Sequence, residues 1–256
     1  MTLRFPNYFW GIGASTPEDA RDLYTMALTQ ARTTFTTRIW EQIYMGEGVT
    51  IGHYRTADVE PGGSVAQYLT THPSAGMLFG GGPVLRRDTR DDAMGPHRGS
   101  FTSLSTTFFR KGWLSDFSYQ IWELDQRVYL PLGNSVLGLQ AYGRYAGGQP
   151  PLDEMSALGG GSRLRGYFEG RYRDRLYMMA QAEWRVRVWK RLSLAPFGAV
   201  GNVFPSFSAI GTEDTKVAGG MGVRVSLKQE RDVNIRLDLA VSPISTGVYL
   251  NLGEAF

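Results

Sequence analysis

Cysteine is absent from the 256 residues of this chain, and histidine occurs only three times. The absence of cysteine excludes disulfide bonds and thiolate metal sites, and it is compatible with an exported protein. Residues 1–6 contain no apolar core followed by a small-residue cleavage site. The chain as given therefore carries no recognisable secretory signal.

Long apolar runs are also absent. The longest stretch without Asp, Glu, Lys or Arg covers residues 61–85 and contains Pro61, Pro73 and Pro83. The next such stretch, residues 192–212, is interrupted by two prolines. A membrane-spanning helix needs about 20 mainly apolar residues with few helix breakers. The sequence therefore predicts no transmembrane helix.

An excess of one charge is lacking as well. The 27 basic and 24 acidic residues are interspersed along the chain and give a formal net charge of +3. Nucleic-acid binding usually requires basic residues clustered on one surface, so nucleic acid is not an expected partner. Gly11 and Gly13 have no following Lys-Ser or Lys-Thr, which excludes a phosphate-binding loop. We expect no cofactor and no metal.

What the chain does contain is alternation with a period of two residues. From Ala180 to Val188 the even positions are apolar and the odd positions are polar or charged. In residues 235–241 the odd positions are aliphatic, whereas Arg236 and Asp238 share the other face. Residues 122–130 follow the same rule, with Gln126 as the exception. Because charges on one face of several strands need a wet interior, we expect the apolar positions to face lipid.

Short turns alternate with longer loops between such segments, as they do in outer-membrane barrels. The short turns lie near Trp40 and at residues 131–134, 190–191 and 229–232. The predicted strands cover residues 2–10, 24–39, 43–58, 77–87, 99–111, 117–129, 136–146, 175–189, 193–204, 216–227, 234–241 and 247–256. The predicted fold is all-β, an antiparallel transmembrane β-barrel with about 12 strands in one domain, residues 1–256. A soluble β-sandwich is the alternative, because it would show the same alternation.

A glycine-rich segment, residues 158–167, ends in Leu164-Arg165-Gly166-Tyr167. It resembles the Arg-Gly-aromatic loop of the BamA/TamA and two-partner-secretion superfamily, in which the loop folds back into the barrel lumen. Residues 8–13, the turn from Asp88 to Gly99 and the last ten residues are also similar to members of the bacterial surface antigen type. The resemblance covers nearly the whole chain.

The end of the chain has its own pattern. Val248, Leu250, Leu252 and Phe256 fall on one face, and we expect the terminal aromatic side chain to lie at a membrane interface. This segment resembles the C-terminal recognition strand of barrel substrates. Its predicted signal residues are Tyr249, Asn251, Gly253 and Phe256.

The resemblance implies a family barrel of sixteen strands, of which the first four would be absent here together with any POTRA domain. This chain would then either leave an open seam or close as a twelve-stranded barrel by pairing residues 2–10 with 247–256. The implied function is insertion or translocation of polypeptides at the bacterial outer membrane. The expected partners are outer-membrane lipid and unfolded outer-membrane or secreted polypeptides. In BamA the first and last strands form a lateral gate, so a passive pore or a membrane anchor without insertase activity stays open as the alternative.

The strand that follows the loop's partner departs from the family motif Phe-x-Asp-x-Gly. Here Ala199 stands at the position of the aspartate that would hold the loop arginine. A guanidinium inside a barrel still needs an acceptor. We expect Arg165 to bond Glu183 first, with Asp238 and Asp125 as further candidates.

An enzyme is the remaining class. A barrel phospholipase would need a Ser-His pair oriented by a third polar residue. His72 and His97 fall in predicted loops or turns, and His53 has no serine motif beside it. The carboxylates predicted on the lumen face, such as Glu123 and Glu183, are better explained as charges balanced by lumen arginines. The sequence predicts that the protein is not an enzyme.

Overall fold

The computed structural model describes residues 3–226 and 234–256. Within these ranges, twelve strands form one sheet in which each strand pairs with the next along the sheet. The first six are β1 (Leu3–Phe9), β2 (Asp22–Trp40), β3 (Ile43–Ala57), β4 (Ala75–Asp88), β5 (Gly99–Phe109) and β6 (Tyr119–Leu132). The others are β7 (Ser135–Gly148), β10 (Leu176–Arg187), β11 (Leu192–Phe204), β12 (Lys216–Ser226), β13 (Asn234–Val241) and β14 (Thr246–Leu252).

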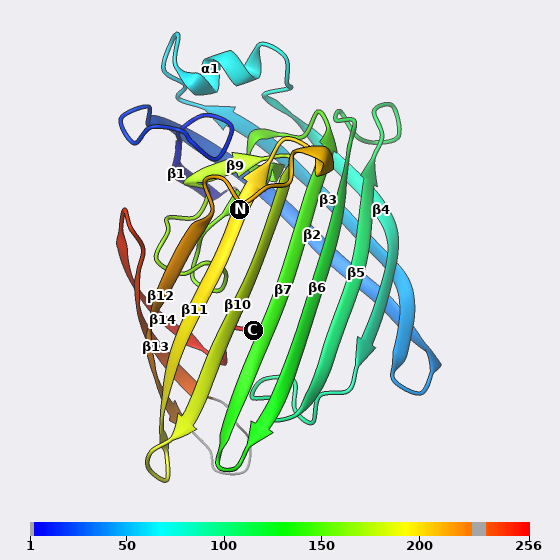
Figure 1. Cartoon of the computed structure of the whole chain (residues 1–256). Helices are drawn as coiled ribbons and strands as arrows, with labels where there is room; N and C mark the ends of the chain where they lie inside the picture. The colour runs from blue at the N-terminus through cyan, green and yellow to red at the C-terminus, as the bar shows by residue number, and fades with distance from the viewer. Residues whose placement is uncertain (1–2, 227–233) are drawn as a thin grey trace.

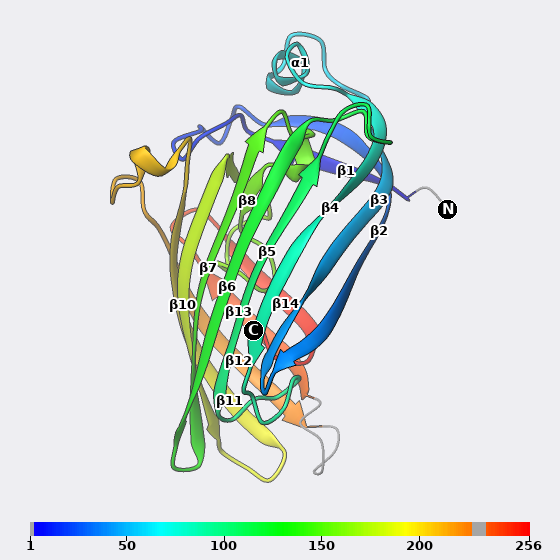
Figure 2. The ribbon, with the colours of Figure 1, turned by 90° about the vertical axis from the view of Figure 1, so that its right-hand side faces the viewer.

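All neighbouring pairs in this sheet are antiparallel. The strands are long and tilted, and the sheet curls into the wall of a barrel (Figures 1 and 2). The predicted all-β antiparallel architecture is confirmed, and each predicted strand corresponds to one strand of the sheet. The turn predicted at residues 229–232 lies outside the described residues.

The two faces of the wall differ as the alternation predicts. On β10, Trp184 is 49% exposed on the outside, whereas the neighbouring Glu183 is fully buried on the inside. On β13, Leu239 is 51% exposed, whereas Asp238 is fully buried. The outer face is therefore apolar, and the charged side chains of these strands lie in the interior. Among the described residues no helix is long and apolar enough to cross a membrane.

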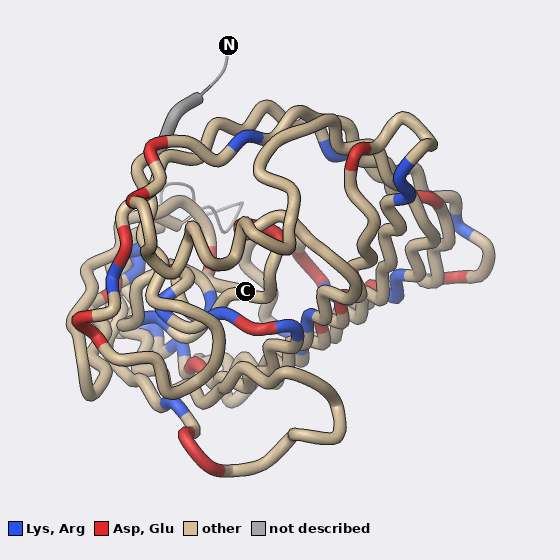
Figure 3. The backbone as a smooth tube through the Cα atoms, turned by 90° about the horizontal axis from the view of Figure 1, so that it is seen from above, with Lys and Arg blue, Asp and Glu red and all other residues tan. Residues whose placement is uncertain are grey.

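The sheet does not close on itself. β1 and β14 lie at its two ends, and no ladder joins them within the described residues. Of the two expected arrangements, the described residues contain the open seam and not the pairing of residues 2–10 with 247–256. After β14 has ended, Gly253 has a φ of 83°, and the chain turns away from the line of the strand. Seen from above, the C-terminal end lies inside the curved wall (Figure 3).

Two parts of the chain were not predicted from the sequence. The helix α1 (Ser64–Leu69) stands above the rim of the wall in the loop between β3 and β4 (Figure 2). The loop between β7 and β10 contains a short 3-10 turn (Leu152–Glu154) and a small hairpin of β8 (Ser156–Leu158) and β9 (Tyr172–Asp174). Elements this short are beyond the reach of a periodicity argument, because they contain too few residues to establish a period.

The exposed outer face leads to a first prediction. Ala180 lies near the middle of β10 on the outer face, and Val188 lies on the same face just beyond the end of the strand. Replacing Ala180→Arg should destabilise the barrel in lipid by about 2–4 kcal/mol, because it places a charge near the membrane midplane. Val188→Arg, the matched control near the interface, should cost about 0–1 kcal/mol. Urea unfolding in lipid vesicles measures both, and equal costs would contradict the assignment of the lipid face.

Candidate functional site

The loop between β7 and β10 enters the interior through a series of tight turns. Gly159, Gly160 and Gly166 have φ angles of 105°, 110° and 107°. These left-handed conformations favour glycine. Leu164 also has a positive φ of 45° and is completely buried, so its side-chain packing holds a backbone conformation that a leucine rarely adopts. The loop that presents Arg165 is therefore fixed on both sides of that residue.

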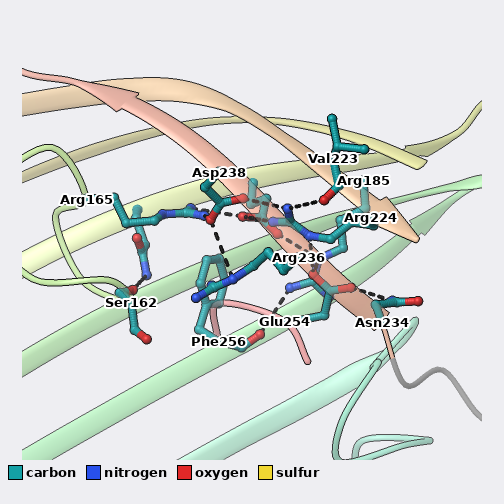
Figure 4. A network of polar contacts seen from close by, with 12 residues as sticks. Ser162, Arg165, Arg185, Val223, Arg224, Asn234, Arg236, Asp238, Glu254 and Phe256 are labelled. Atoms are coloured by element: carbon teal, nitrogen blue, oxygen red, sulfur yellow. Dashed lines mark hydrogen bonds and ion pairs between the residues drawn. The ribbon is translucent and has the colours of Figure 1, made fainter. Parts of the chain in front are cut away.

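Arg165 points into a cluster of buried charges (Figure 4). Its Nη2 lies 2.9 Å from Oε2 of Glu183, and its Nη1 lies 2.5 Å from Oδ2 of Asp238. None of these three side chains is exposed to solvent. The guanidinium also lies over the ring of Phe197, 3.5 Å from its centroid, which adds a cation–π contact. The structure thus brings Arg165 together with two of its three candidate carboxylates.

The third candidate, Asp125, is not a partner of Arg165. Its Oδ2 lies 2.5 Å from Nη2 of Arg127, and its Oδ1 accepts a hydrogen bond of 2.7 Å from Gln140. Arg127 is two residues further along β6, on the same face of the strand. Asp125 therefore pairs with Arg127 of its own strand, and Arg165 of the loop pairs with carboxylates on β10 and β13.

The departure at Ala199 has a structural counterpart. Ala199 is buried in an apolar cluster that includes Leu164 and Tyr167 of the loop. The acceptor comes instead from the neighbouring strand, where Glu183 is paired in register with Phe197. A carboxylate on β10 therefore serves the arginine in place of one on β11.

The charge cluster extends beyond the residues predicted from sequence. Arg224 lies 3.0 Å from Glu183, 2.6 Å from Asp238 and 2.8 Å from Glu254. Arg185 lies 3.0 Å from Glu183 and 3.4 Å from Glu254. Arg224 and Arg185 therefore bridge the acceptors of the loop arginine to Glu254, which follows β14. A buried carboxylate that several guanidiniums share has opposite charges around it, whereas an isolated buried charge has none.

The last residues of the chain fold into the interior rather than continuing along the wall. Phe256 is 5% exposed, its ring stacks near that of Tyr129, and its carbonyl oxygen accepts a bond of 3.1 Å from Arg185. The expected interfacial position of Phe256 is therefore wrong. The sequence contains a sign of this, because Glu254 interrupts the apolar series of Val248, Leu250 and Leu252. A charge at that register position indicates that the strand ends before it.

The remaining motif residues hold the loop against the last strands. The backbone N–H of Gly166 donates to the hydroxyl of Tyr249 at 3.0 Å, and the carbonyl of Gly166 accepts from Ser242 at 3.0 Å. Tyr167 donates to the carbonyl of Val217 on β12 at 3.2 Å. Asn251, which alternation places on the same side of β14 as Tyr249, has an exposed side chain. Of the predicted C-terminal signal residues, Tyr249 is the one that contacts the loop motif directly.

Two of the histidines have identifiable neighbours, and His97 lines the same cavity as Arg185 and Arg224. His72 stacks on Tyr68 above the rim, with ring centroids 3.9 Å apart, and His97 lies 3.9 Å from Asp91 in the turn between β4 and β5. The described residues contain no group of three or more His, Asp or Glu side chains that could hold a metal ion.

Comparison with known proteins assigns the family. The model of the Omp85 superfamily domain matches residues 10–256. The chain belongs to the Omp85 superfamily. No curated protein matches its sequence. Among solved structures, this Omp85 chain is similar to BamA from Haemophilus ducreyi lacking POTRA domains 1–3, with a TM-score of 0.68 and 12% identity.

That similarity covers 98% of this Omp85 chain and 57% of the BamA chain. The chain thus spans just over half the length of the structure that it matches. At 12% identity the likeness is one of fold, and it places the antiparallel wall described above among the membrane barrels of the Omp85 superfamily.

The buried ion pairs predict the effect of removing the loop arginine. Arg165→Ala should lower the stability of the barrel by about 1.5–3 kcal/mol, because it removes charge-assisted bonds while Arg224 still compensates Glu183 and Asp238. The midpoint of the heat-induced shift in electrophoretic mobility measures this change. Arg163→Ala is the matched control, since Arg163 lies over the Tyr142 ring at 3.5 Å. A drop no larger than that of the control would contradict the locking role of Arg165.

The tail contacts predict a second effect on stability. Glu254→Ala removes the carboxylate that Arg185 and Arg224 share, and it should cost roughly 1–3 kcal/mol because two buried guanidiniums lose an acceptor. Asn251→Ala, an exposed position on the preceding strand, is the control and should change stability by less than about 0.5 kcal/mol. The same electrophoretic midpoint is measured. An unchanged midpoint for Glu254→Ala would show that the inward tail does not stabilise the barrel.

Proposed function

We propose that this chain forms the membrane-embedded wall of a bacterial outer-membrane protein that inserts or translocates polypeptides. Family membership supports the class of protein. The observation that carries the proposal is the free edge of β14. This strand is bonded to the loop between β7 and β10, and among the described residues no strand pairs with its other edge.

The side chains on this edge fit an incoming strand. Val248, Leu250 and Leu252 are 69–71% exposed, whereas Leu239 on the adjacent β13 is 51% exposed. Each unpaired backbone group in lipid costs several kcal/mol, so a free edge in a membrane is a strong template for pairing with another strand. An unfolded outer-membrane polypeptide can supply a strand with alternating lipid-facing residues. Outer-membrane lipid covers the rest of the apolar outer face.

The chemistry proposed is strand pairing and release, and the protein is not an enzyme in this proposal. No bond of the substrate is made or broken. The loop between β7 and β10, here called the lumen loop, and the last residues of the chain would keep β12, β13 and β14 in place while β14 exchanges its partner. The lumen loop is bonded to β13 and β14, and Glu254 is bonded to Arg224 on β12.

Insertion can be measured directly. The full chain is reconstituted in phosphatidylcholine vesicles, an unfolded eight-stranded barrel is added, and its rate of folding is followed by protection from protease. We expect a faster rate than with empty vesicles. Leu250→Lys, which puts a charge on the free edge, should return the rate toward that of empty vesicles. Leu104→Lys on β5 is the control, since it places the same charge on the outer face away from the edge.

A passive pore or a membrane anchor is the alternative function. A cavity of about 930 Å³ opens at the end of the barrel that has the short turns between strands. It is lined in part by Arg185, Arg187 and Arg191. Stable ion conductance in a planar bilayer, without faster folding of the added barrel, would favour the pore. The absence of both activities would favour the anchor.

A further inference from the structure

Asp153 and Glu154 lie in the short 3-10 turn of the loop between β7 and β10. The Arg-Gly-aromatic motif does not explain their contacts. Oδ1 of Asp153 accepts hydrogen bonds from Asn7 at 3.0 Å and from the Tyr24 hydroxyl at 2.6 Å. Its Oδ2 accepts from the Tyr54 hydroxyl at 3.2 Å. Asn7, Tyr24 and Tyr54 lie on β1, β2 and β3 respectively. One loop carboxylate therefore bonds the first three strands of the sheet.

Glu154 reinforces this attachment. Its Oε1 lies 2.5 Å from Nη2 of Arg32 on β2, and its Oε2 lies 2.9 Å from Nη2 of Arg144 on β7. Leu152, beside this pair, is fully buried in an apolar cluster with Phe9 of β1 and Tyr24 of β2. The turn from Leu152 to Glu154 is thus held by both charge and packing against the amino-terminal end of the sheet.

The other end of the same loop is held by the last three strands. Tyr167 bonds β12, Arg165 bonds Asp238 on β13, and Gly166 bonds Tyr249 on β14. The two sets of strands flank the seam where β1 and β14 do not pair. The loop is therefore a direct connection across the interior between the two sides of an open barrel.

We propose that Asp153 and Glu154 are positioning residues that form a second anchor of the lumen loop, which thereby acts as a brace and fixes the width of the seam between β1 and β14. Arg165 is the first anchor, on the opposite side. Because the loop is attached on both sides of the seam, loosening the attachment at either end lets the two sheet edges move apart. The proposal holds whether or not the chain inserts polypeptides.

Spin labels on the two sides of the seam test the brace. The chain contains no cysteine, so single cysteines at Leu23 on β2 and Val248 on β14 can be labelled without background. Both side chains are exposed on the outer face, at 52% and 69%, so the labels do not contact the loop. Electron–electron resonance in phosphatidylcholine vesicles then gives the distribution of distances across the seam.

In Asp153→Ala/Glu154→Ala we expect this distribution to shift or broaden by about one strand spacing, ~5 Å, relative to the parent. Arg165→Ala should do the same. Combining the three substitutions should add little to either, because loosening one end already lets the two edges move apart. Two independent local contacts would instead give additive changes. Asp88→Ala, which removes the carboxylate 2.8 Å from Arg90 at the end of β4, is the control and should leave the distribution unchanged.

An unchanged distribution in Asp153→Ala/Glu154→Ala would overturn the proposal, and so would additive widening in the combined variant. The conservative pair Asp153→Asn/Glu154→Gln keeps side-chain size and removes only charge. It replaces the alanine pair if that variant does not assemble in vesicles, and it is judged by the same two outcomes.

Discussion

The arrangement of the barrel interior depends on the groups that pair with one buried guanidinium. Arg165 is removed from solvent completely and is held by Glu183, Asp238 and the ring of Phe197. A single unpaired charge in such a place would be prohibitively costly, whereas a network in which each carboxylate serves more than one arginine is self-consistent. These charges can pair in this way only with the loop, β13 and the last residues of the chain in the positions that they have here. The cluster therefore contributes less to net stability than to selecting one arrangement of these segments.

An open sheet places unusual demands on such a cluster. In a closed barrel the ladder itself holds the first strand against the last, but here that ladder is absent among the described residues. Side chains and one loop have to replace it. The short β1 pairs with β2 over residues 22–28, and the remainder of β2 is an exposed edge. The Glu154–Arg32 ion pair attaches the loop to this part of β2, whereas Asn7, Tyr24 and Tyr54 lie where β1, β2 and β3 are paired.

Much of the wall could be predicted from the sequence, because lipid on one side and water on the other impose alternation with a period of two residues. The strand Asn234–Val241 was located to the residue on that basis. The family resemblance implies the inward path of Arg165, and the need of a buried guanidinium for an acceptor indicates its carboxylate partners. Arg224, Glu254 and Asp153 could not be ranked in advance, since a lumen charge in sequence does not reveal which distant charge it meets. Alternation does not predict the inward position of Phe256, because it does not predict the positive φ of Gly253.

The substitution at Ala199 carries a consequence for how relatives of this chain can be recognised. The arginine requires a carboxylate nearby, and in this chain β10 supplies one although Ala199 stands at the motif position on β11. An acceptor on one strand can therefore stand in for an acceptor on another. A search for the Phe-x-Asp-x-Gly pattern would pass over such chains. A search for acidic side chains on the lumen face of any strand that the loop arginine can reach would recover them.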